Sequence, residues 1–232
     1  MSVNDLVLVQ GMADTKRTLR GWNERPLVPL RPWLVLSLAT AIALLGAVWL
    51  VAHLTPADPT ELVLPGLTRS VELEDVLRIL YRNSLVLALH AMACVAGFMA
   101  GSSLPLSAAN RSGLDRWVHD RAGKLAIGFV AAATLFSLST QAVGIGGLAS
   151  QVAGQLDISP ALLIMGLLPH ALPELTALFL PLAAWIVASR AGRWDELLAA
   201  TVVTVALAVP VVVLSAVIEV WVSPRWLMLL VG

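Results

Sequence analysis

The residues best suited to chemistry are a histidine and a glutamate in the apolar segment Pro169-His170-Ala171-Leu172-Pro173-Glu174. His170 and Glu174 are four positions apart, so they share one face if this segment is helical. Such a pair could relay a proton, bind a metal ion or cap a broken helix. Zinc takes three or four ligands from the protein in most sites, and the sequence offers no clear third ligand. We therefore expect no metal site and no cofactor, and we assign no catalytic residue.

Other polar residues also fall inside apolar stretches. Ionisable groups within a membrane are costly, so each of them marks a candidate site. The sequence predicts one polar cluster in the outer half of the protein, formed by Arg82, Asn83, His90, Gln141, His170, Glu174 and Glu219. The pattern leaves open whether this cluster locks helices together or handles a substrate.

The elements that must position these groups are apolar helices. Hydrophobic residues make up 58% of the 232 residues and charged residues 13%, whereas about 25% of a soluble chain is charged. About 20 apolar residues span a bilayer, and in lipid such a segment must be helical to satisfy its backbone. We predict an all-α, polytopic transmembrane helix bundle, with about five spans at residues 33–52, 84–106, 125–148, 160–188 and 197–222. Residues 1–32 form a cytoplasmic segment, and residues 33–232 form a single transmembrane domain.

Three local patterns refine this bundle. Pro169 and Pro173 each remove a backbone donor, so we expect the fourth helix to break near them. Gly97 and Gly101 form a GxxxG pattern, which allows close helix packing within the chain or in a dimer. Residues 70–82 combine apolar and charged side chains at helical spacing, which predicts an amphipathic outer helix that either lies on the membrane surface or packs on the bundle.

Basic residues concentrate in alternate segments of the chain. Residues 1–32, 107–124 and 189–196 together hold 11 of the 15 lysines and arginines. The positive-inside rule then places the N-terminus in the cytoplasm and the protein in the cell (inner) membrane. Within residues 107–124, Arg116 and Trp117 are candidates for docking a cytoplasmic partner. A net charge of zero gives no reason to expect nucleic acid as a partner.

These motifs resemble those of the stage II sporulation protein M family of integral membrane proteins. The segment 168–174 is similar to that family's Pro-His-Gly-x-x-Glu signature, with Ala171 in place of the glycine. The tail 216–224 resembles its closing Ile-Glu-aromatic-x-Thr-Pro pattern, and Arg82-Asn83 resembles its Asn-Asn pair. The likeness covers residues 71–226, and the departures are those of a divergent member.

The resemblance implies a non-enzymatic membrane subunit of a multi-protein envelope complex, with a scaffold or assembly role. Other family members occur beside ATP-binding-cassette (ABC) ATPases. The alternative is therefore a permease-like subunit of an ABC-type exporter that carries a peptide or lipid and is powered by a separate ATPase. A third alternative is an intramembrane enzyme that uses His170 and Glu174. The expected partners are membrane lipids, other membrane or peripheral proteins such as an ABC ATPase, and a second copy of the chain in a homo-oligomer.

Overall fold

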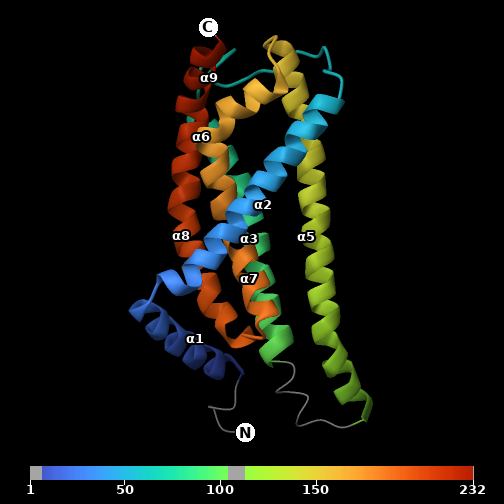
Figure 1. Cartoon of the computed structure of the whole chain (residues 1–232), viewed down its shortest axis with the longest axis vertical. Helices are drawn as coiled ribbons and strands as arrows, with labels where there is room; N and C mark the ends of the chain where they lie inside the picture. Colours follow the sequence, from blue (N-terminus) through green and yellow to red (C-terminus); the bar gives the residue numbers. More distant parts are fainter. Residues whose placement is uncertain (1–6, 104–112, 232) are drawn as a thin grey trace. The chain divides into compact units, whose positions relative to one another are not determined.

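The computed structural model describes the backbone of residues 7–103 and 113–231, and side chains at 11–101, 113, 125 and 127–231. Helices account for most of these residues, and the only β-pairing among them is an isolated bridge between Pro65 and Arg69. The α-helices, labelled in Figure 1 where there is room, are α1 (Val7–Glu24), α2 (Leu27–Leu54), α3 (Leu73–Phe98), α5 (Gly113–Gln155), α6 (Pro160–Leu178), α7 (Leu180–Arg190), α8 (Leu197–Val217) and α9 (Ser223–Val231). Short 3-10 and π-helical segments join some of them: η2 (Met99–Ser103), η3 (Trp194–Glu196) and η4 (Ile218–Val222).

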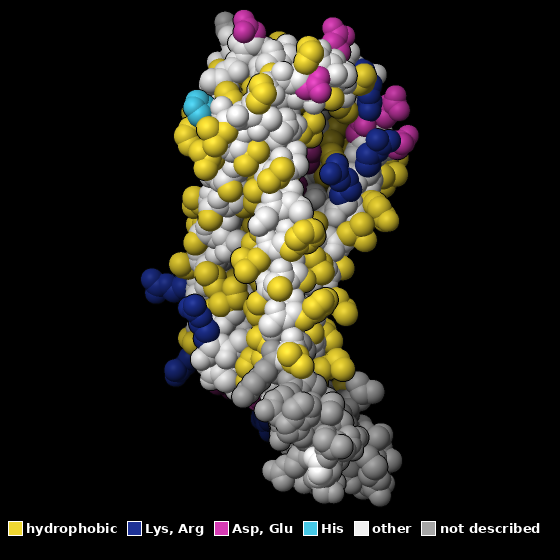
Figure 2. Space-filling model, turned by 90° about the vertical axis from the view of Figure 1, so that its right-hand side faces the viewer, with side chains coloured by type: hydrophobic (Ala, Val, Ile, Leu, Met, Phe, Trp, Pro, Cys, Tyr) yellow, Lys and Arg dark blue, Asp and Glu magenta, His cyan; other side chains and the backbone are white. Residues whose placement is uncertain are grey.

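Within the described residues, five helical segments are long and apolar enough to cross a membrane. They are Leu27–Leu54, Leu73–Gly101, Ile127–Gln155, Pro160–Arg190 and Trp194–Val231. Figure 2 shows hydrophobic side chains exposed along the helices on the face drawn, which suits a surface that meets lipid. The prediction of an all-α bundle with five spans is confirmed.

The second span begins earlier than its apolar stretch suggests. The predicted amphipathic helix at 70–82 is not a separate element, because α3 runs without interruption from Leu73 to Phe98. No proline or glycine occurs between Leu73 and Ala96, so nothing ends the helix. Its start is fixed instead by Asp75, whose carboxylate accepts a hydrogen bond from the Glu72 backbone N–H at 3.0 Å.

The fourth span is broken, but the predicted position of the break was wrong. Helix α6 continues through Pro169 and Pro173 and ends at Leu178, and α7 begins at Leu180. Pro181 lies in the first turn of α7, where its missing N–H has no helical partner to lose. In Figure 1 the first turns of α6 run at an angle to its remainder, so the helix is bent but not interrupted.

The chain forms two compact units, each assembled from separate stretches of sequence. Unit 1 comprises Met1–Ser37, Leu87–Thr134 and Phe179–Leu207. Its core is a cluster in which the Trp33 ring meets the edge of Trp22 at a centroid distance of 5.2 Å. The other buried members of this cluster are Leu180, Ala183, Ala184 and Ala200.

Unit 2 comprises Leu38–Val86, Leu135–Leu178 and Ala208–Gly232. Part of its core is formed by Val76 of α3, Ala216 of α8 and Val220 of η4. Helix α5 also approaches α2 closely in this unit, since a Cβ atom added at Gly146 would lie 2.6 Å from Cβ of Val51.

Side chains of α5 hold the irregular segment between α2 and α3. The Gln155 amide donates to the Leu62 carbonyl at 2.9 Å and accepts from the Leu62 N–H at 2.8 Å. Gln151 donates to the Thr60 carbonyl at 2.9 Å. Ser150 donates to the Thr55 carbonyl at 2.6 Å. These bonds satisfy backbone groups that would otherwise lack partners, and they fix the segment to α5.

Candidate functional site

A buried hydrogen bond joins α6 to the start of α9 in unit 2. Nδ1 of His170 lies 2.6 Å from Oγ of Ser223, and the two residues are 6% and 2% exposed. The helices are close here, because a Cβ atom added at Gly166 would lie 2.6 Å from Cδ1 of Leu227. A buried polar pair of this kind satisfies both partners and fixes the register of the two helices.

Glu174 follows one turn later on α6 and is half-buried. Its carboxyl group interacts electrostatically with the Asn83 amide of α3 and with the like-charged carboxyl group of Glu219. Oε2 of Glu174 and Nδ2 of Asn83 are nevertheless both buried without a hydrogen-bond partner among the described atoms. Unsatisfied buried polar atoms are rare in native proteins and call for an explanation.

Glu219 lies in the π-helical turn η4, between α8 and α9. Such turns shift the faces of a helix and occur frequently at functional sites. The Glu219 carboxyl group interacts electrostatically with the guanidinium of Arg82 on α3, whose side chain is exposed. Two carboxyl groups, one guanidinium and one amide thus come together from α3, α6 and η4.

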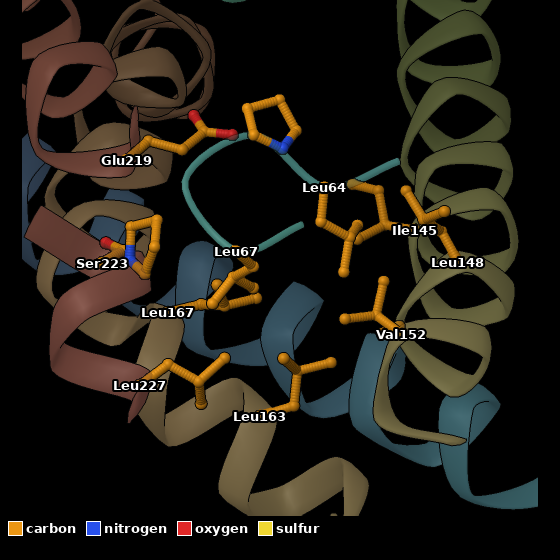
Figure 3. A pocket seen from close by; sticks show the side chains of 13 residues that line it. Leu64, Leu67, Ile145, Leu148, Val152, Leu163, Leu167, Glu219, Ser223 and Leu227 are labelled. Atoms are coloured by element: carbon orange, nitrogen blue, oxygen red, sulfur yellow. The ribbon is translucent and has the colours of Figure 1, made fainter. Parts of the chain in front are cut away.

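Glu219 also borders a cavity of about 250 Å³. Apart from Glu219 and Ser223, its walls are apolar: Leu64, Pro65, Leu67, Ile145, Leu148, Ala149, Val152, Leu163, Leu167, Pro224 and Leu227. Figure 3 shows the Glu219 carboxyl group at the rim, directed toward the loop that carries Leu64 and Leu67. The cavity therefore combines an apolar interior with a single acidic group.

The loop that forms one wall of this cavity is tightly held. Gly66 has φ of +80°, and a Cβ atom added there would lie 2.8 Å from Cγ of Pro224. Thr68 closes the turn, since its N–H donates to the Leu64 carbonyl at 2.9 Å. Arg69 then ties the loop to α3 through two bonds to Asp75, at 2.9 and 2.5 Å. Hydrogen bonding to that carboxylate raises the pKa of the Arg69 guanidinium above its ordinary value.

Of the seven residues predicted to form one cluster, four interact with one another: Glu174 with Asn83 and Glu219, and Glu219 with Arg82. His170 lies one turn from Glu174 on α6 and bonds to Ser223. Gln141 lies in the same unit, but its amide donates to Oγ of Ser137 one turn earlier in α5, at 3.0 Å. His90 belongs to unit 1, where it is buried with its ring 5.4 Å from that of Phe179.

The two glycines of the GxxxG pattern lie against tryptophan rings in unit 1. A Cβ atom added at Gly97 would be 2.8 Å from Trp185, and one at Gly101 would overlap Trp194. Close packing at this pattern therefore occurs within the chain. Arg116 and Trp117 fall in α5 at positions outside the described side chains.

Sequence reasoning missed Ser223, the hydrogen-bonding partner of His170. It follows the last predicted span and precedes a proline, so it reads as a polar residue at a helix end. Among the described residues, no group of three or more His, Cys, Asp and Glu side chains could hold a metal ion. Comparisons with protein-family models, with curated proteins and with solved structures found no match for this chain.

Proposed function

We propose that this chain is a non-enzymatic membrane subunit that serves as a scaffold in a multi-protein envelope complex, as its resemblance to the stage II sporulation protein M family implies. The observation that carries this proposal is the uneven burial of the spans. In the most apolar part of Pro160–Arg190, 56% of the residues are buried, against 11% in Ile127–Gln155. Helix α5 thus leaves a large part of its apolar surface to other molecules.

The glycines of α5 favour a second helix as its neighbour. A Cβ atom added at Gly144 or Gly147, which are three positions apart and share a face of α5, would meet no neighbouring group within 4 Å. Small residues on an open helix face let another backbone approach closely, and the resulting van der Waals packing favours helix association in lipid. We therefore assign the face of α5 that carries these glycines to a helix of another membrane subunit.

The test compares two glycines that both have open space around them, Gly144 on α5 and Gly46 on α2. The tagged chain is crosslinked in the membrane through a photoreactive residue at Phe136, which is exposed on α5. Mass spectrometry then identifies the crosslinked proteins. We expect Gly144→Ile to abolish crosslinking to a membrane-protein partner and Gly46→Ile to preserve it. Equal crosslinking in both variants would overturn the assignment of α5 as the docking helix.

We infer that the protein lies in the cell (inner) membrane with its N-terminus in the cytoplasm. Unit 1 includes the N-terminus and holds 11 of the 15 lysines and arginines, whereas unit 2 holds four. The positive-inside rule counts basic residues and so favours unit 1 as the cytoplasmic side. Replacing the lone buried Cys94 by alanine allows a unique cysteine at the exposed Met12 or Val63. An impermeant maleimide added to intact cells should label Val63→Cys and leave Met12→Cys unlabelled, and the opposite pattern would reverse the orientation.

A second candidate function is that of a permease-like subunit of an ABC-type exporter. It is favoured by the cavity and by the buried, unsatisfied Oε2 of Glu174, since such groups often line a substrate path. This candidate requires an ATPase that co-purifies with the chain and is lost when Arg116 and Trp117 are replaced by alanine. It also requires that Glu174→Gln preserves assembly and stops transport. If Glu174→Gln instead lowers the yield of the assembled complex, the group has a structural role.

A further inference from the structure

The cavity beside Glu219 has the size and lining of a site for an amphiphile. An engineered apolar cavity of about 150 Å³ accommodates benzene, so a cavity of about 250 Å³ can hold a short stretch of hydrocarbon chain. All of its lining residues are apolar except Glu219 and Ser223. The Ser223 hydroxyl is already bonded to His170. Glu219 is therefore the polar group of the wall that can select the headgroup of a bound amphiphile.

Glu219 and Arg82 are the two groups that can select a polar head. Glu219 is the acidic group in the cavity wall, and Arg82 of α3 acts on it electrostatically from outside that wall. A carboxyl group in an apolar wall is stabilised by a charge-assisted hydrogen bond, so an ammonium group is a suitable partner for Glu219. The exposed Arg82 side chain meanwhile presents a guanidinium that suits phosphate. A ligand that places a positive group at Glu219 and a negative group at Arg82 is a zwitterion.

We propose that this cavity binds a phospholipid with a primary-amine headgroup. Its ammonium lies at Glu219, its phosphate lies at Arg82, and part of an acyl chain fills the apolar slot. This site goes beyond the scaffold function, because α5 supplies only part of its wall and no protein partner is needed to complete it. A primary ammonium donates three N–H hydrogen bonds, whereas the quaternary nitrogen of choline donates none. The phosphate distinguishes such a lipid from the N-terminus of a hydrophobic peptide, which carries an ammonium group but offers no phosphate to Arg82.

The experiment measures lipids retained by the full chain, purified in mild detergent, by native mass spectrometry. The probes are phosphatidylethanolamine, phosphatidylcholine and phosphatidylglycerol with identical acyl chains, added at equal concentration. We expect phosphatidylethanolamine to be retained at least about tenfold more than the other two, the discrimination expected from a charge-assisted hydrogen bond in a partly buried site. Equal retention of phosphatidylcholine would show that the amine is not recognised. Preferential retention of phosphatidylglycerol would show that Arg82 alone dominates. Either result would overturn the proposal.

Three variants locate the site. Glu219→Gln removes the charge with little change of shape and should reduce the preference for phosphatidylethanolamine about tenfold. Ala149→Leu places a larger side chain in the buried wall of the cavity and should reduce retention of that lipid with Glu219 intact. Glu61→Gln removes an exposed carboxylate outside the cavity and should leave retention unchanged. Wild-type retention in both Glu219→Gln and Ala149→Leu would sink the proposal.

A measurement on the unmodified protein covers the case in which a variant does not fold. Octylamine carries a primary ammonium and an alkyl chain, and octyltrimethylammonium carries the same chain without N–H donors. Octylamine should displace retained phosphatidylethanolamine at lower concentration than its trimethylated analogue. Displacement by both compounds at the same concentration would mean that the cavity selects only for the chain.

Discussion

Replacing Gly66 by alanine tests whether the loop at the cavity is as tightly seated as the structure indicates. Gly66 has φ of +80°, and a Cβ atom there would lie 2.8 Å from Cγ of Pro224 and 3.2 Å from the Val220 carbonyl oxygen. The left-handed backbone costs about 1–2 kcal/mol for a residue with a side chain. Overpacking against Pro224 and the backbone adds about 1–3 kcal/mol. The lower entropy of alanine in the unfolded chain offsets about 0.4–1 kcal/mol. We expect Gly66→Ala to lower the free energy of unfolding by about 2–4 kcal/mol.

Gly192 provides a matched control for this substitution. Its φ is +67°, but a Cβ atom there would meet nothing within 4 Å. Gly192→Ala therefore carries only the backbone cost, and we expect it to lower the free energy of unfolding by about 1 kcal/mol. Both values can be measured by titrating a denaturing detergent into mild-detergent micelles and following the loss of helical structure. If the two variants lose equal stability, Gly66 is not pressed against Pro224 and the reasoning is refuted.

Three further predictions concern residues outside the cavity. Gln155→Ala removes two hydrogen bonds to the Leu62 backbone. It should lower the free energy of unfolding by about 1–3 kcal/mol and speed amide hydrogen exchange at Leu62 at least about fivefold. Unchanged exchange at Leu62 would contradict this. Asp157 has φ of 54°, a conformation that asparagine tolerates and a β-branched residue does not. Asp157→Val should therefore lose about 1–2 kcal/mol of stability and Asp157→Asn almost none. Equal melting temperatures of the two variants would contradict this. Hydrogen bonds from Thr60 hold the pKa of Asp58 below its ordinary 3.8, so their stabilising effect is complete above that pH and disappears as the pH falls through the folded-state pKa. Thr60→Val should raise the Asp58 pKa in an NMR titration, and an unchanged titration curve would refute this.

The number and type of the helices could be predicted because both depend on runs of apolar residues, which are visible in the sequence. The residues at which a span starts and bends could not be predicted, because they depend on which local residues favour or oppose the helix. Leu73 begins α3 well before the apolar run, since no residue in between ends a helix. Helix α6 continues through Pro169 and Pro173 and ends at Leu178, and Pro181 lies in the first turn of α7.

The candidate site was predictable in part for a similar reason. Glu174 and Glu219 stand out because charge is rare in apolar runs, and the predicted alternation of spans places them in the same half of the membrane. Ser223 does not stand out, because its importance comes from a contact with His170 across 53 positions of sequence. The cavity was not predictable either, since its walls are ordinary apolar residues of several separate segments. Only their packing reveals a space.

The hydrogen bonds between Gln155 and Leu62 block backbone pairing with another copy of the chain at this residue. A glutamine amide carries a donor and an acceptor side by side, as a peptide group does, and here it meets both backbone groups of Leu62. It therefore occupies the place that a neighbouring strand would take. An irregular segment with open backbone groups invites pairing with other chains and subsequent aggregation. By capping Leu62 with a side chain, the protein closes this route without adding a strand.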